Sequence, residues 1–192
     1  MRMMRNITLD IETTSAAPGR IDPNTMELAI VCIHDSKTDS YDSFTKEELP
    51  RLWPTLEHAD ALIGYNSDHF DIPILNKYYP GDLTRIKSID LLASIRDSLG
   101  RRLKLDSVAE ATLGRKKIGS GLDSVTWWNE GLIDKVREYC IEDVRITKEV
   151  YEYALKNGSV KYMDFGEKKI VPIDTSAWEN GDTSALNHTL PF

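Results

Sequence analysis

The sequence predicts a mixed α/β fold, in which a five-stranded sheet is covered by helices on both faces. Three strand-like segments follow one another closely near the start, which favours an antiparallel meander. Strand-like and helix-like segments then alternate, a pattern typical of strands that lie between packed helices. The predicted strands cover residues 5–11, 27–35, 39–44, 59–65 and 86–92.

The first two predicted helices begin at capping signals. Thr45 followed by Glu48 forms a capping box, which predicts a helix running toward His58. The next helix is expected over about 68–79. We predict Asp68 as its N-cap, because a carboxylate at that position can accept hydrogen bonds from the free amides of the first turn.

Later in the chain, glycines mark the ends of the helices. The helix after the last core strand stops at Gly100, and a short helix opened by the capping box Ser107–Glu110 ends at Gly114. The longest predicted helix covers about 132–156 and stops at Asn157–Gly158. Its residues at helical spacing are Val136, Cys140, Val144, Thr147, Tyr151 and Leu155.

The last part of the chain divides in two. Residues 160–173 predict a hairpin around Phe165–Gly166. Residues 174–192 are polar and lack periodicity, so we expect a loose tail there. The packed domain is therefore expected to cover residues 1–173.

The composition is that of an ordinary globular protein, with 41% hydrophobic and 29% charged residues among 192. The net charge of −7 argues against a protein coated in basic patches. Cys32 and Cys140 lack metal-ligand spacing, so we expect reduced core cysteines in a cytosolic protein. No apolar run is long enough for a signal peptide or a membrane span, which predicts a cytoplasmic location without membrane contact.

Asp10 and Glu12 are the first sign of a functional site. They stand two residues apart on a predicted strand, so both side chains leave the same face while Ile11 points into the opposite layer. Two like charges near the centre of a sheet are costly unless cations neutralise them. A single pair of this kind is also common on an exposed strand face, so its meaning depends on the other acids.

Further positions complete the acidic pattern. Asp71 lies just inside the helix after the fourth strand, and Tyr139 and Asp143 share one face of the longest helix. Asn66 follows the fourth strand, where it is either a turn former or a side-chain amide for a ligand. Together the acids predict a site for two divalent metal ions, and an all-oxygen ligand set suits Mg²⁺ or Mn²⁺.

The segment 85–117 is basic, with nine basic residues against four acidic ones in an acidic protein. Two interpretations stay open, a solvated surface or a phosphate-binding rim that guides a strand end toward the metals. Trp127 and Trp128 leave a similar choice between core packing and base stacking. The basic residues are Arg85, Lys87, Arg96, Arg101, Arg102, Lys104, Arg115, Lys116 and Lys117.

Three segments resemble the exonuclease motifs of a known family. They are LDIET (9–13), GYNSDHFDIPIL (64–75) and YCIEDVRITKEVY (139–151). These segments resemble the three motifs of the DEDD 3′–5′ exonuclease superfamily, tyrosine subclass, which implies a ribonuclease-H-like fold. The chain is most similar to the proofreading domain of family-B DNA polymerases and its free-standing relatives, over about residues 5–155. No polymerase domain follows, so we expect a free-standing exonuclease.

The resemblance implies a role for each matching residue. Asp10, Glu12 and Asp143 would hold the metal nearer the attacking water. Asp10 would also bridge to a second metal, on which Asp71 would act directly or through water. Tyr139 would position the nucleophile. The histidine subclass of this superfamily has its histidine five residues before the final aspartate, and that position is Glu138 here, so the tyrosine subclass is the one implied. The residues expected to contact the substrate are Asn66, Thr13, Arg101, Arg102, Lys116 and Lys117.

The expected function is that of a metal-dependent 3′–5′ exonuclease. It would release nucleoside 5′-monophosphates from the 3′ end of single-stranded nucleic acid, with DNA favoured and a role in DNA repair or proofreading. The alternatives are a catalytically weak binding module of the same fold and a ribonuclease acting on RNA 3′ ends. An endonuclease of the ribonuclease H type would share the acids without needing Tyr139 beside Asp143. The sequence does not identify a polymerase or repair partner.

Overall fold

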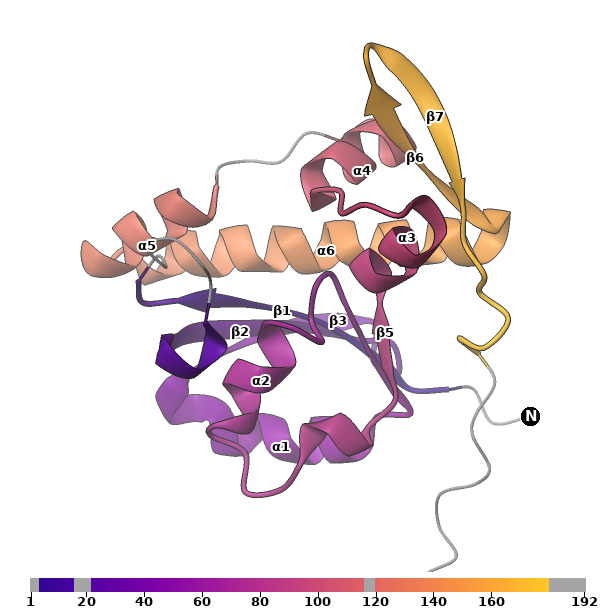
Figure 1. Ribbon diagram of the computed structural model, residues 1–192. Helices are drawn as coiled ribbons and strands as arrows, with labels where there is room; N and C mark the ends of the chain where they lie inside the picture. The colour runs from indigo at the N-terminus through magenta and orange to yellow at the C-terminus, as the bar shows by residue number, and fades with distance from the viewer. Residues whose placement is uncertain (1–3, 16–21, 116–119, 180–192) are drawn as a thin grey trace, which may run out of the picture.

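A computed structural model describes residues 4–15, 22–115 and 120–179 of the chain. A mixed five-stranded sheet lies between helical layers, as the sequence predicts (Figure 1). The strands are β1 (Asn6–Thr13), β2 (Leu28–Asp35), β3 (Ser40–Thr45), β4 (Ala61–Gly64) and β5 (Ser88–Asp90). They run in the order β3-β2-β1-β4-β5, with the first three antiparallel and with β4 and β5 parallel to β1.

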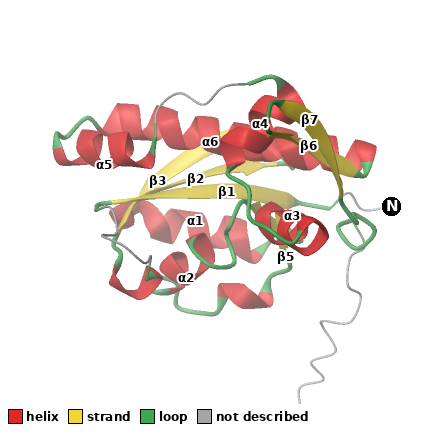
Figure 2. Ribbon diagram, turned by 45° about the horizontal axis from the view of Figure 1, so that its top comes forward, coloured by secondary structure: helices red, strands yellow, loops and turns green. Residues whose placement is uncertain are grey.

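Helices cover both faces of this sheet, and a hairpin follows the longest of them. The helices are α1 (Leu49–Glu57), α2 (Asp71–Asn76), α3 (Leu91–Leu99), α4 (Leu105–Leu113), α5 (Gly121–Asn129) and α6 (Ile133–Asn157), and the hairpin pairs β6 (Ser159–Asp164) with β7 (Glu167–Pro172). Helices α1 and α2 lie on one side of the sheet, and α6 crosses the other side together with α5 (Figure 2). In the part of the chain described, no helix combines the length and the apolar content needed to cross a membrane.

Alternation along β1 separates an apolar face from an acidic one. Ile7, Leu9 and Ile11 are buried in the core that α1 and α2 share with the sheet. Asp10 and Glu12 leave the opposite face, where Asp143 of α6 lies close to them. Apolar packing surrounds this acidic patch, with Ile30 and Cys32 of β2 in one cluster with Val136, Cys140 and Val144 of α6.

Most of the predicted boundary signals act as expected. The Thr45 amide donates to the Glu48 carboxylate at 3.0 Å, although this capping box opens a short 3-10 turn that leads into α1. Gly100, Gly114 and Gly158 each end a helix in the left-handed conformation, with φ of 77°, 73° and 61°. The buried, free Cys32 and Cys140 are also as predicted.

The sequence analysis missed one helix and misplaced the start of another. Helix α5 was not predicted, because its apolar residues form no continuous stripe and its capping box, Ser120–Asp123, uses the shorter aspartate. Ser107 is not an N-cap, because α4 begins two residues earlier, at Leu105, and its N-cap residue is Lys104.

The prediction of Asp68 as the N-cap of α2 is also wrong. Helix α2 begins at Asp71 and is preceded by Phe70. The Asp68 amide donates to Asp90 Oδ2 at 3.2 Å, and the Asp68 carboxylate accepts from Ser88 Oγ at 2.5 Å. Both partners belong to β5, so this neighbouring strand holds the turn and the predicted helix loses its first residues.

The packed part of the chain extends past the expected start of the tail at residue 174. Trp178 is buried and stacks on Tyr151 of α6, with ring centroids 5.3 Å apart and planes 18° from parallel. The Lys87 ammonium group donates to the Trp178 carbonyl at 3.1 Å. The rest of the expected tail, 180–192, lies outside the described residues.

We predict that Gly64→Ala destabilises the protein. A Cβ at Gly64 would lie 2.4 Å from Ser67 Cβ and 2.5 Å from Ser67 Oγ, so the turn after β4 must shift. Overpacking of this kind typically costs about 1–3 kcal/mol, and urea unfolding would measure the loss. Gly121→Ala is the matched control, because a Cβ there meets nothing within 4 Å. Equal losses in the two variants would contradict the steric explanation.

Candidate metal centre

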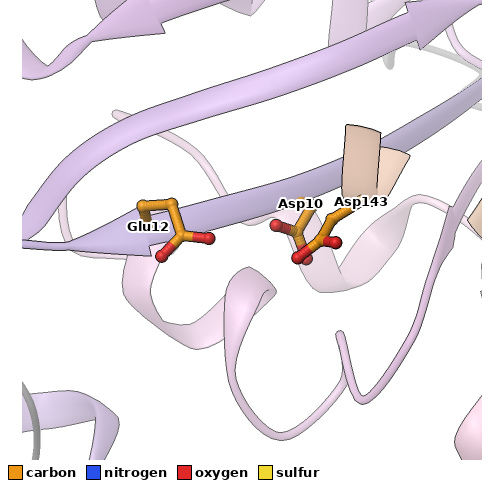
Figure 3. Close-up of side chains that lie close together, drawn as sticks. All are labelled: Asp10, Glu12 and Asp143. Atoms are coloured by element: carbon orange, nitrogen blue, oxygen red, sulfur yellow. The ribbon is translucent and has the colours of Figure 1, made fainter. Parts of the chain in front are cut away.

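Three carboxylates from two elements meet at the centre of the sheet. Asp10 and Glu12 come from β1 and Asp143 from α6, and one oxygen of each lies within 4.8 Å of the others (Figure 3). Asp143 is 4% exposed and Glu12 is 8% exposed, while Asp10 is partly buried. The structure therefore brings together three of the four acids that the sequence singles out.

This arrangement fits a hard divalent cation. Three carboxylates so close in a poorly solvated place repel one another, and a bound cation would remove that repulsion. The cluster consists of carboxylate oxygens, which is the ligand type that Mg²⁺ and Mn²⁺ prefer. Asp10, Glu12 and Asp143 are thus the residues that could hold a metal ion.

Asp71 approaches the same strand from the N-terminal end of α2. Its Oδ1 accepts a hydrogen bond from the Ile11 amide at 3.1 Å, midway between Asp10 and Glu12 along β1. Asp71 is 4% exposed and is not one of the three clustered carboxylates. Burial, followed by the charge of Asp90 and that of Glu12, raises the pKa of Asp71 to about 8.

Asp90 is a buried carboxylate that the sequence reasoning overlooked. It caps α3 by accepting from the Leu92 amide at 2.9 Å, and it also accepts from the Asn66 amide at 2.8 Å. With its hydrogen bond from Asp68, Asp90 holds the whole turn between β4 and α2, which leads to Asp71. The position of Asp90 in the sequence could have indicated this role, since an aspartate between a strand and a helix is a typical N-cap.

Tyr139 and Asp143 lie one turn apart on α6, and both are buried. The Tyr139 ring packs edge-on against Trp127, with centroids 6.0 Å apart and planes at 72°. Trp127 is half-buried and packs against the cluster of β2 and α6, which agrees with the core interpretation. Tyr139 also lines a cavity of about 500 Å³ between α5 and α6.

Cys140 adds a thiol beside the acids. Its sulfur lies 3.4 Å from the Asp10 carbonyl oxygen and 3.8 Å from Asp10 Oδ2. Burial, followed by the neighbouring Cys32, raises the pKa of the Cys140 thiol, so it stays protonated and donates toward Asp10.

A second cavity, of about 350 Å³, is lined in part by Glu12. Thr13 is at its edge, and the Thr13 hydroxyl donates to the Ser15 carbonyl at 3.0 Å. The walls are largely apolar, and they come from β1, the turn before α2 and the start of α5. The lining residues are Ile11, Glu12, Thr13, Phe70, Ser120, Gly121, Leu122 and Val125.

Two of the basic residues expected to contact substrate, Arg101 and Arg102, make contacts within the protein. Arg102 Nη2 donates to Asn66 Oδ1 at 2.6 Å, and Asn66 is left-handed with φ of 68°. Arg101 Nη2 donates to Asp164 of β6 at 2.8 Å. Arg102 therefore lies at the turn before Asp71, whereas Arg101 joins the hairpin. Lys116 and Lys117 lie outside the described residues.

The raised pKa of Asp71 predicts a pH-dependent stability for the metal-free protein. The folded state keeps the Asp71 proton up to a pH of about 8, whereas an unfolded chain loses it near 3.9. Between these values the folded state binds more protons, so its stability falls as pH rises, by at most about 1.4 kcal/mol per pH unit. Asp71→Asn removes this proton, while its side-chain oxygen can still accept from Ile11.

Urea unfolding in excess chelator, at several pH values across this window, tests the prediction. The free energy of unfolding of wild type relative to Asp71→Asn should fall as pH rises. Parallel curves for the two proteins would show that Asp71 does not hold a proton in the folded state.

Comparison with known proteins agrees with this architecture. No curated protein sequence matches the chain. Among solved structures it is similar to the family B DNA polymerase from the hyperthermophilic archaeon Pyrobaculum calidifontis, with a TM-score of 0.63 and 21% identity. The similarity covers 80% of this chain and only 25% of the polymerase chain, and at this identity it shows a shared fold. Residues 7–155, which hold the sheet, α6 and the acidic cluster, match the RNase_H superfamily, and the chain therefore belongs to that superfamily.

Proposed function

We propose that the protein is a metal-dependent nuclease that removes nucleotides from the 3′ end of single-stranded nucleic acid, with DNA favoured. The observation that carries this proposal is the meeting of Asp10, Glu12 and Asp143, one helical turn from the buried Tyr139. Membership of the RNase_H superfamily supports a nuclease. The resemblance of segments 9–13, 64–75 and 139–151 to the motifs of 3′–5′ exonucleases supports an exonuclease in particular, and the fold shared with part of a family B DNA polymerase is consistent with it.

In this proposal the carboxylates form a binding site for two divalent cations, Mg²⁺ or Mn²⁺. Asp10, Glu12 and Asp143 would hold them, with Asp71 serving the second from the far side of β1. When bound, such cations would lower the pKa of a water molecule and stabilise the charge on the leaving oxygen of the phosphodiester. The apolar packing of α6 on β2 fixes the carboxylates in advance, so little rearrangement is needed for binding.

Tyr139 would orient the attacking water through its hydroxyl group. Its ring is held by the edge-on contact with Trp127, and the same helix carries Asp143. Because the two residues lie four apart on one helix, the Tyr139 hydroxyl and the Asp143 carboxylate leave the same face of α6. An endonuclease of the ribonuclease H type would not need this pairing.

The cavity beside Glu12 is suited to the terminal nucleotide. Its volume of about 350 Å³ falls in the range of small-molecule sites, about 300–1,000 Å³. Phe70 and Leu122 give it apolar walls against which any base can pack, as expected for recognition independent of sequence. Asn66, held by Arg102 and Asp90, belongs to the turn that leads to Phe70 and would contact the substrate from there.

The proposal predicts metal-dependent digestion from the 3′ end. A 5′-labelled single strand incubated with Mg²⁺ or Mn²⁺ should give a ladder of shortening products and release nucleoside 5′-monophosphates. Parallel DNA and RNA strands would identify the substrate, since a 2′-hydroxyl is the feature that distinguishes them. Digestion that persists in excess chelator, or a single internal cut, would contradict an exonuclease of this type. Binding of the strand without digestion would favour the catalytically weak module.

The proposed division of labour predicts unequal losses of activity. Asp143→Ala should abolish turnover, because it removes a carboxylate of the cluster. Tyr139→Phe should retain measurable turnover, because it removes one hydroxyl and no cation ligand. A positioned group that transfers protons contributes about 10²–10⁴-fold, and one that only orients water should contribute less.

Single-turnover rates at saturating strand measure both effects. Glu152→Gln is the matched control on α6, because Glu152 is exposed and pairs with Lys148 away from the cluster. Equal losses for Tyr139→Phe and Asp143→Ala would show that the roles are assigned wrongly.

A further inference from the structure

The β6–β7 hairpin has one face that packs on the protein and one that does not. Val160 and Tyr162 of β6 and Val171 of β7 are buried in the core formed with α4 and α6. On the other face, Ile170 is 66% exposed and Met163 is 43% exposed. Figure 1 shows the hairpin projecting past α4.

The tip of the hairpin carries an aromatic residue at a position that does not suit it. Phe165 and Gly166 form the two-residue turn, and both have positive φ, 47° and 84°. Such a turn favours Asn or Asp followed by Gly, and a bulky residue with positive φ is strained. The Phe165 side chain is 100% exposed, so no burial offsets that strain. A strained and exposed aromatic residue points to a function other than folding.

Cations alternate with the exposed apolar residues on the same face. In the strand register Lys161 pairs with Ile170 and Met163 pairs with Lys168, so all four side chains belong to this face. Lys168 is exposed, whereas Lys161 is half-buried at the edge of the face, with its Nζ 5.6 Å from the centroid of the Tyr153 ring of α6. Lysine is depleted at protein–protein interfaces. Lysines beside an exposed aromatic residue are instead typical of surfaces that bind single-stranded nucleic acid, where cations neutralise phosphates and rings stack on bases.

We propose that this face, with Phe165 at its tip, is a second binding surface for the nucleic-acid strand whose 3′ end enters the acidic cluster. We call it the hairpin surface, defined by Lys161, Met163, Phe165, Lys168 and Ile170. Phe165 stacks on a base, and the two lysines neutralise phosphates. This inference rests on the proposed function in one respect, namely that the 3′ end of the strand lies at the acidic cluster.

Helix α6 sets the distance between the two contacts. Asp143 and the helix end at Asn157 are 14 residues apart, about 21 Å at 1.5 Å per residue. A stacked strand advances about 3.4 Å per nucleotide, so about six nucleotides are needed to pass from the acids to the base of the hairpin. Affinity should therefore rise with strand length beyond about six nucleotides.

Phe165→Asn tests the proposal without threatening the fold, because Asn suits the first position of this turn. We expect its stability in urea to equal or exceed that of wild type. Fluorescence anisotropy in chelator, with labelled DNA and RNA strands of about 6, 12 and 20 nucleotides, measures binding without digestion. The longest strand should bind about 5- to 150-fold more weakly to Phe165→Asn, as expected for the loss of one stacked base. Wild-type affinity for that strand in the variant would overturn the proposal.

The lysines have a separate test. Lys161→Ala with Lys168→Ala should lower the slope of log affinity against log salt by about 1.4 for the longest strand, which is about 0.7 for each lost phosphate contact. Lys46→Ala with Arg51→Ala is the matched control, because it removes two exposed cations from α1 and the turn that leads into it, away from the hairpin. An equal change of slope in both double variants would overturn the assignment to the hairpin surface.

The outcomes separate this inference from the proposed function. Binding in chelator requires no hydrolysis, so it is informative even if no digestion is seen with any metal. Failure of the inference would appear as equal binding by wild type and Phe165→Asn while digestion continues. Anionic vesicles of phosphatidylserine serve as a further probe. Vesicle binding that Phe165→Asn abolishes, with strand binding unchanged, would assign the hairpin surface to a membrane and overturn the inference.

Discussion

The packing of α6 across β1 and β2 holds together a set of groups that electrostatics alone would drive apart. Asp10, Glu12 and Asp143 repel one another, yet they are placed within 4.8 Å because Val136, Cys140 and Val144 bury their side chains on Ile30 and Cys32 immediately beside them. The apolar contacts thus stabilise the position of the charges, and the charges weaken the contacts. A cation bound at the cluster would neutralise the repulsion between the carboxylates, and it would then stabilise the same docked position of α6 that the apolar contacts favour.

The turn between β4 and α2 is a second place where one buried group organises several others. Asp90 accepts from the amides of Asn66 and Asp68 while capping α3, so a single carboxylate fixes the turn that delivers Asp71 to β1. Gly64 allows Ser67 to fold back against the strand. The acids of the site therefore fall into two groups, with three carboxylates clustered across α6 and β1 and a pair, Asp71 and Asp90, that shapes the approach from the other side.

The fold was predictable from the sequence because its strands carry local signals. Turn residues separate β1, β2 and β3, and the acids of β1 alternate with buried aliphatic residues, so the strands and the face of the site followed from spacing alone. Capping signals were less reliable where a distant strand holds the candidate cap, or where the helix begins before it. Asp68 and Ser107 had the right chemistry for caps, but β5 holds the first and an earlier helix start displaces the second. The partners of Arg101 and Arg102 could not be predicted, since Asp164 and Asn66 lie far from them in sequence. The phosphate-binding rim therefore remains a prediction.

The distance along the chain between the clustered acids bears on how the protein folds. Cys140 contacts Asp10 across 130 residues, so the cluster forms only after a contact of very long range has closed. The antiparallel meander β1-β2-β3 closes much shorter loops and should form early, whereas the docking of α6 should come late. A partly folded chain with the meander alone would hold Asp10 and Glu12 without Asp143 and would bind divalent cations poorly. Divalent ions in the solution would then leave the rate of the early collapse unchanged and act mainly by slowing the undocking of the last helix.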